Sequence, residues 1–157
     1  MILDGQNQFS DDQALTATAV SANVIDLGAA RSIGSGEPLA VVFTVSVDAD
    51  QTTGDEDYQF DVKYATNAAL TSGEQLLGRR IFESGTPTAP AQNADLLVAG
   101  YKFYVPIPPV TLGESARYLG VEYTLSGTSP SVTVSAHLIP MSFAQSEEEY
   151  ANGYDIA

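Results

Sequence analysis

The residues with chemistry suited to catalysis are few in this sequence and are not grouped. His137 is the single histidine, and it alternates with apolar positions of a predicted strand. Serine hydrolases need a histidine base beside the nucleophile, and the Gly-x-Ser-x-Gly turn that presents such a serine does not occur. Cysteine is absent, which excludes thiolate nucleophiles, thiolate zinc sites and disulfides. We expect no catalytic residue, and we expect that the protein is not an enzyme.

An acidic cluster is the one place in the sequence where a metal ion is a candidate ligand. Its members are Asp48, Asp50, Asp55, Glu56 and Asp57. Calcium prefers several oxygen ligands, but the spacing does not match an EF-hand loop, and the glutamate required at the twelfth position is missing. A solvated hairpin tip therefore explains the cluster better than a calcium site. Glycine motifs that bind phosphate are also absent, so we expect no metal and no cofactor.

Apolar residues recur with a period of two over most of the chain, which is typical of β-strands with one buried face. The clearest alternation lies at residues 41–47, 58–64, 101–105, 119–125 and 132–138. Weaker candidates at 23–27 and 75–84 bring the count to about seven, and 67–77, interrupted by a Thr-Ser-Gly triplet, is interpreted as a loop. Turn-forming residues separate the strands. The sequence therefore predicts an all-β, single-domain antiparallel jelly roll or β-sandwich.

The two ends of the chain differ from the middle. Residues 1–22 and 140–157 are polar, with isolated apolar side chains, so we assign them as N- and C-terminal arms around a jelly-roll domain at 23–139. The apolar side chains that would fill pockets on partner subunits are Ile2, Leu3, Phe9, Phe143, Tyr150 and Tyr154. Frayed termini, the ordinary behaviour of chain ends, are the alternative.

The charge of the chain excludes some partners. Twenty acidic residues stand against six basic ones, for a formal net charge of -14. Binding to nucleic acid depends on clusters of Lys and Arg, so we expect no nucleic-acid partner. No apolar run approaches the roughly 20 residues of a membrane helix, and the N-terminus lacks the pattern of a secretory signal. The acidity fits either solubility alone or an acidic face matched to a basic partner.

Several blocks of the sequence, in order, carry a resemblance to a known family. They include Met1–Asp4, Gln8–Asp11 and Asn23–Gly28 near the start, and Val105–Pro109 and Arg117–Leu119 further along. In these blocks, which span roughly residues 1–45 and 101–139, the chain resembles the capsid cement, or decoration, proteins of short-tailed bacteriophages. No single motif among them is diagnostic; the order of the blocks carries the resemblance.

The resemblance implies a virion structural protein without enzymatic activity. It implies a jelly roll bound to the outer surface of an icosahedral capsid, where it bridges neighbouring major capsid protein subunits and stabilises the shell against internal DNA pressure. It also implies synthesis in the bacterial host cytoplasm and a homo-oligomer, a dimer in the first place, with a trimer as the alternative. The contacts with partners are expected from the terminal arms and from residues 101–109, which contain Tyr104, Pro106 and Pro108. A stiff loop between strands is the simpler explanation of these prolines.

A carbohydrate-binding or adhesin-type β-sandwich is the alternative function. If tyrosines at 58, 64, 104 and 123 were exposed, their rings would stack on sugars. The absence of tryptophan weakens this alternative.

Overall fold

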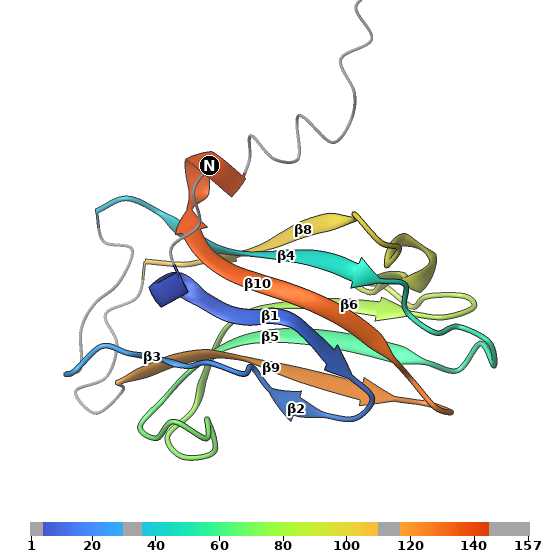
Figure 1. Cartoon of the computed structure of the whole chain (residues 1–157), viewed down its shortest axis with the longest axis horizontal. Coiled ribbons are helices and arrows are strands. Elements are labelled where there is room, and N and C mark those ends of the chain that lie inside the picture. Colours follow the sequence, from blue (N-terminus) through green and yellow to red (C-terminus); the bar gives the residue numbers. More distant parts are fainter. Residues whose placement is uncertain (1–4, 30–35, 110–116, 145–157) are drawn as a thin grey trace, which may run out of the picture.

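The computed structural model describes residues 5–29, 36–109 and 117–144, which form two sheets packed face to face (Figure 1). One sheet has four strands in the order β1-β10-β4-β8. The other has six, in the order β2-β9-β5-β6-β7, with β3 also paired to β9. The strands of the first sheet are β1 Gln8–Leu15, β10 Val132–Pro140, β4 Leu39–Val47 and β8 Lys102–Ile107. Those of the second are β2 Ala19–Val20, β9 Tyr118–Ser126, β5 Asp57–Ala65, β6 Gln75–Glu83, β7 Gln92–Asn93 and β3 Ile25–Asp26.

The order in which the chain visits the sheets gives the molecule a jelly-roll topology. The chain passes from β1 to the six-stranded sheet, returns for β4, crosses again for β5 and β6, and alternates once more through β8, β9 and β10. All pairings are antiparallel except that of β6 with the short β7. The predicted fold class, an all-β antiparallel jelly roll, is therefore confirmed.

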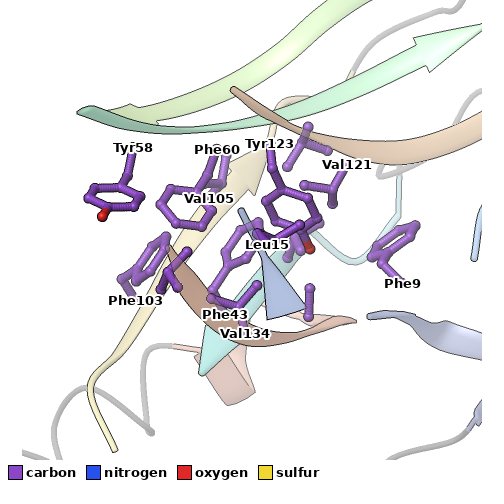
Figure 2. Close-up of a cluster of buried hydrophobic side chains, with 14 of the residues drawn as sticks. Phe9, Leu15, Phe43, Tyr58, Phe60, Phe103, Val105, Val121, Tyr123 and Val134 are labelled. Carbon is purple, nitrogen blue, oxygen red and sulfur yellow. The ribbon is translucent and has the colours of Figure 1, made fainter. Parts of the chain in front are cut away.

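Aromatic rings from both sheets fill the space between them. Phe43 of β4 stacks on Phe103 of β8, with ring centroids 4.9 Å apart, and Phe60 of β5 meets Phe103 edge to face at 5.0 Å. Tyr123 of β9 packs edge to face against Phe43 and Phe60 (Figure 2). Edge-to-face and offset pairs of this kind add to the free energy gained by burying apolar surface. The centre of the core thus consists of aromatic side chains, which the alternating pattern directs toward the opposite sheet.

All strands predicted from clear alternation are present. Of the two weaker candidates, 75–84 corresponds to β6, and 23–27 contains the two-residue strand β3. Residues 67–77 contain no helix, in agreement with the loop interpretation. The sequence pattern misses β1 and the two-residue strands β2 and β7. In β1, register shifts between Gln8 and Ser10 and between Ser10 and Gln13 break the period of two. As a result Phe9 and Ser10 are consecutive in sequence and both fully buried.

The N-terminal strand is an integral part of the sandwich. β1 pairs with β10 over its length, and the Ser10 hydroxyl is hydrogen-bonded to the hydroxyl of Tyr123 in the opposite sheet at 2.7 Å. β2 then pairs with β9. The sandwich therefore begins at Gln8, inside the segment 1–22 that the sequence pattern assigned to an arm.

Candidate partner-binding surface

Four of the residues expected to contact partners lie around strand β8. Tyr104 and Pro106 face outward from β8, Pro108 follows the strand, and Phe143 belongs to a short helix at residues 141–144. That helix packs on the outer face of the four-stranded sheet, where Ala144 and Ile139 form a small apolar cluster with Tyr104 and Met141 against it. We call the set Tyr104, Pro106, Pro108, Met141 and Phe143 the β8 surface.

The position of Pro106 follows from the hydrogen-bonding pattern of β8. The N–H of Val45 donates to the C=O of Tyr101 at 2.9 Å. Because bonded pairs recur at every second residue of an antiparallel ladder, the odd-numbered residues of β8 are those bonded to β4. Pro106, paired with Ala40, therefore lacks its N–H on the side that faces away from β4. Pro106 thus lies in an edge strand and not in a loop between strands, since β8 is the last strand of its sheet.

A groove of about 380 Å³ adjoins the β8 surface where β6 passes the edge of β8. It is lined by Leu77, Gly78, Arg79, Val105, Pro106 and Pro108. Gly78 makes the close approach possible, because a Cβ at this position would overlap the Cγ1 atom of Val105 and lie 3.0 Å from the carbonyl oxygen of Pro106. The groove thus has apolar walls and one arginine at its rim.

The arginine at the rim is held by a carboxylate of the six-stranded sheet. Arg79 Nε and one terminal nitrogen donate to the two oxygens of Asp61, each at 2.7 Å. Asp61 is only 1% exposed although it lies on the outer face, and Gln59 donates a further hydrogen bond to it. This bidentate pair raises the pKa of Arg79 and fixes its guanidinium beside the groove.

The first residues of the expected C-terminal arm are attached to the sandwich. The N–H of Met141 donates to the carbonyl of Pro38 at 2.8 Å, and Ala144 is 1% exposed. Phe143, by contrast, is 49% exposed. The helix therefore presents one aromatic side chain outward while it covers the sheet with its other face.

The other expected partner contacts do not join this surface. Phe9 is fully buried between the sheets, which corrects the expectation that it reaches a partner: its side chain fills the core of its own chain (Figure 2). The remaining four, Ile2, Leu3, Tyr150 and Tyr154, lie outside the described residues.

The acidic cluster forms an internally hydrogen-bonded loop. Glu56 is fully buried, and its carboxylate accepts hydrogen bonds from the Thr53 hydroxyl and from the N–H groups of Thr53, Gly54 and Asp55. These bonds, that of the Thr53 hydroxyl first, lower the pKa of Glu56 to about 2. The solvated hairpin tip is thus more ordered than expected, with Glu56 organising its backbone. Among the described residues no group of metal-ligating side chains is arranged to hold an ion.

His137 and the tyrosines occupy places that limit other functions. His137 lies half-buried on the outer face of β10, where burial lowers its pKa and Asp11 acts in the opposite direction. Tyr58, Tyr64 and Tyr123 are fully buried, so the tyrosines proposed to stack on sugars are core residues, apart from the partly exposed Tyr104. No helix in the described part of the chain is long and apolar enough to cross a membrane.

Sequence reasoning missed the contribution of β6 and of the short helix. Leu77 and Gly78 complete the groove, and Met141 and Ala144 cover the sheet. The glycine inside the weakly alternating segment 75–84 was a usable signal, because a glycine within a strand often marks a close backbone approach. The packing of Met141 and Ala144 leaves no periodic pattern, since the helix is a single turn.

Comparison with known proteins identifies the family of the chain. A search of curated proteins found none that matches. The family model Bbp16 matches residues 9–138, a range that runs from β1 to β10 and includes strands of both sheets. Because this match spans most of the chain, the protein belongs to the Bbp16 family.

Proposed function

We propose that this protein is a virion structural protein, a cement or decoration protein bound to the outer surface of an icosahedral bacteriophage capsid. In this proposal it is not an enzyme. It is made in the bacterial host cytoplasm as a homo-oligomer, most simply a dimer, and bridges neighbouring major capsid protein subunits. Nucleic acid and membranes are not among its partners.

The observation that carries the proposal is the β8 surface. It places a partly exposed tyrosine, two prolines and the 49% exposed ring of Phe143 at one edge of a sandwich with a densely aromatic core. Exposed aromatic side chains beside rigid backbone are typical anchors of protein interfaces. The ordered sequence resemblance to cement proteins supports the same assignment, because one of its blocks, residues 105–109, contains Pro106 and Pro108 of this surface.

The physical basis of the proposed role is additional interface area. A protein that spans two subunits adds contacts that must break before the subunits separate, and a stable interface buries roughly 1,200–2,000 Å². Symmetry repeats this gain at every equivalent position of a shell. A rigid jelly roll suits the role because load applied at its edge is carried by paired strands: β8 is bonded to β4, and β4 to β10.

The proposed function is tested by co-sedimentation of the purified protein with purified expanded capsids at near-physiological salt. We expect saturable binding, with a ratio of protein to capsid subunit fixed by the symmetry of the shell. Unexpanded capsid precursors serve as the control for adhesion to any shell. Absence of binding to expanded capsids, or binding that rises without saturation, contradicts the proposal. A reproducible glycan-array signal instead would favour the adhesin alternative.

A further inference from the structure

One edge of the six-stranded sheet, at β6, is unpaired over most of its length. β7 pairs only with Phe82 and Glu83, so residues 75–81 have a neighbouring strand on one side alone in the described structure. A free edge of this kind is a template for a strand from another chain. The other outer strands are poorer templates, because β8 contains Pro106, β1 is bulged, and β2, β3 and β7 have two residues each.

The backbone groups of Arg79 and Ile81 point out of this edge. The N–H of Ser84 donates to the C=O of Glu56 at 2.9 Å, in register with the ladder between β5 and β6. Bonded pairs recur at every second residue, so the even-numbered residues from 78 to 82 are those bonded to β5. Within the described part of the chain, the backbone N–H and C=O groups of Arg79 and Ile81 have no hydrogen-bond partner. Two donors and two acceptors are therefore available to an added strand.

Two positions along the edge distinguish one side chain of an added strand from another. Gly78 and Arg80 pair with the core residues Val62 and Phe60, so both lie on the side of β6 that faces the four-stranded sheet. At Gly78 this side opens into the groove beside β8. Another hollow, of about 220 Å³, includes Arg80 in its lining. The two positions are about 7 Å apart along the strand, which is the spacing of alternate side chains in a partner strand.

The charges at this edge favour a segment that carries a carboxylate. Arg79 is neutralised by the bidentate contact with Asp61, which holds its side chain over β5 and away from the free edge. Arg80, by contrast, forms no ion pair with a carboxylate of the described residues. A second copy of β6 would bring its own two arginines to the same short stretch, and like charges on opposite strands destabilise the pairing. The edge therefore fits an acidic partner better than another copy of itself.

We propose that the free edge of β6 accepts an extended segment of a partner protein as an added strand. The segment has an apolar residue opposite Gly78, whose side chain enters the groove beside β8, and an acidic residue two positions away, opposite Arg80. Main-chain hydrogen bonds to Arg79 and Ile81 supply affinity, and the two alternate side chains supply specificity. This inference does not rest on the capsid function, because it states the chemistry of the segment and not the protein that carries it.

The test is a titration of the complete chain with two capped peptides, followed by the amide signals in NMR spectra. Thr-Glu-Thr-Leu-Thr has the proposed pattern for an antiparallel strand, and Thr-Leu-Thr-Glu-Thr has it for a parallel one. We expect saturable shifts of the Arg79 and Ile81 amides with one of them. The amide of Ala19, on the opposite edge of the same sheet, is the internal reference and should not move. The same peptides with lysine in place of glutamate should bind more weakly.

Variants of the chain separate the charge from the backbone contribution. Arg80→Gln should lower the affinity for the glutamate peptide roughly two- to fivefold, the value of an exposed ion pair. Arg117→Gln, which removes an equal charge at the β3–β9 edge, should leave the affinity unchanged. Ile81→Pro removes an N–H that points away from β5, so it should block the added strand and keep the ladder of the sandwich. If the proline variant does not fold, Arg80→Gln decides.

Four results would overturn the proposal. Three come from the titrations: no saturable shift at Arg79 and Ile81 with either glutamate peptide, equal affinity for the lysine peptides, or unchanged affinity in Arg80→Gln. The fourth is a shift of the same two amides when the protein is diluted without peptide, which would assign the edge to a second copy of the chain.

Discussion

The hydrogen bond between Ser10 and Tyr123 predicts a measurable coupling between the two sheets. Ser10→Ala leaves the buried Tyr123 hydroxyl without a partner, which costs about 2 kcal/mol. Gln13 loses the hydrogen bond from the Ser10 hydroxyl but keeps another, because its side-chain oxygen still accepts from the N–H of Ala22 at 2.9 Å. Tyr123→Phe costs less, about 1 kcal/mol, since the Ser10 hydroxyl still donates to Gln13 at 2.7 Å.

The double variant should be less destabilised than the sum of the single variants, because no buried hydroxyl remains unpaired. We expect a coupling free energy of about 1 kcal/mol. Urea unfolding of the four proteins measures it, and the Ser10→Ala variant should also lose roughly 4–8 °C in Tm. Ser126→Ala, which removes an exposed hydroxyl bonded to Asp57, is the matched control and should change stability by less than about 0.5 kcal/mol. If both core variants are as stable as wild type, β1 is not held against the opposite sheet by the bond between Ser10 and Tyr123.

Two further perturbations test other parts of the fold. Gly78→Ala should cost about 1–3 kcal/mol, because the added Cβ overlaps Val105 in a closely packed corner; Gly36→Ala, which has no atom within 4 Å of its Cβ, is the control in urea unfolding. The pKa of Glu56 is lowered from 4.5 to about 2, so its stabilising effect is complete above pH 4.5 and is lost as pH falls toward 2. The Tm of wild type should therefore exceed that of Glu56→Gln at pH 7, and the gap should close by about pH 2; a gap independent of pH would show that the carboxylate is not the source.

Much of the fold was predictable because its strands have one buried face. In β5, β9 and β10 the alternation of apolar and polar residues runs almost without interruption, and each follows a turn-rich segment. β1 was not predictable in the same way. Its bulges place Phe9 and Ser10 inward together, and its polar composition is satisfied by specific bonds such as that of Asp12 with Ser135.

The candidate surface was predictable in part. Pro106 and Tyr104 lie in a strand that ends in prolines, and prolines in a strand point to an edge. The groove depends on the approach of β6 to β8, two strands that are not paired with each other. Gly78 signals a close approach within β6, but no local pattern identifies β8 as the strand that it approaches. For Phe9 the prediction was wrong. An aromatic residue in a polar segment suggested a contact with a partner, whereas the register shifts of β1 direct the Phe9 side chain into the core.

The central claim is that the β8 surface binds a capsid, and a pair of charge substitutions tests it most directly. Phe143→Asp and Val98→Asp replace apolar side chains that are 49% and 46% exposed. Phe143 lies in the short helix after β10, and Val98 lies in the loop between η2 (Ala94–Leu96) and β8. The end of β10 and the start of β8 are at opposite ends of the four-stranded sheet, whose strands β4, β8 and β10 are seen in Figure 1. In co-sedimentation with expanded capsids, Phe143→Asp should weaken binding at least about tenfold, as expected for an interface anchor, and Val98→Asp should bind like wild type. Equal binding of both variants, or selective loss with Val98→Asp, would contradict the account.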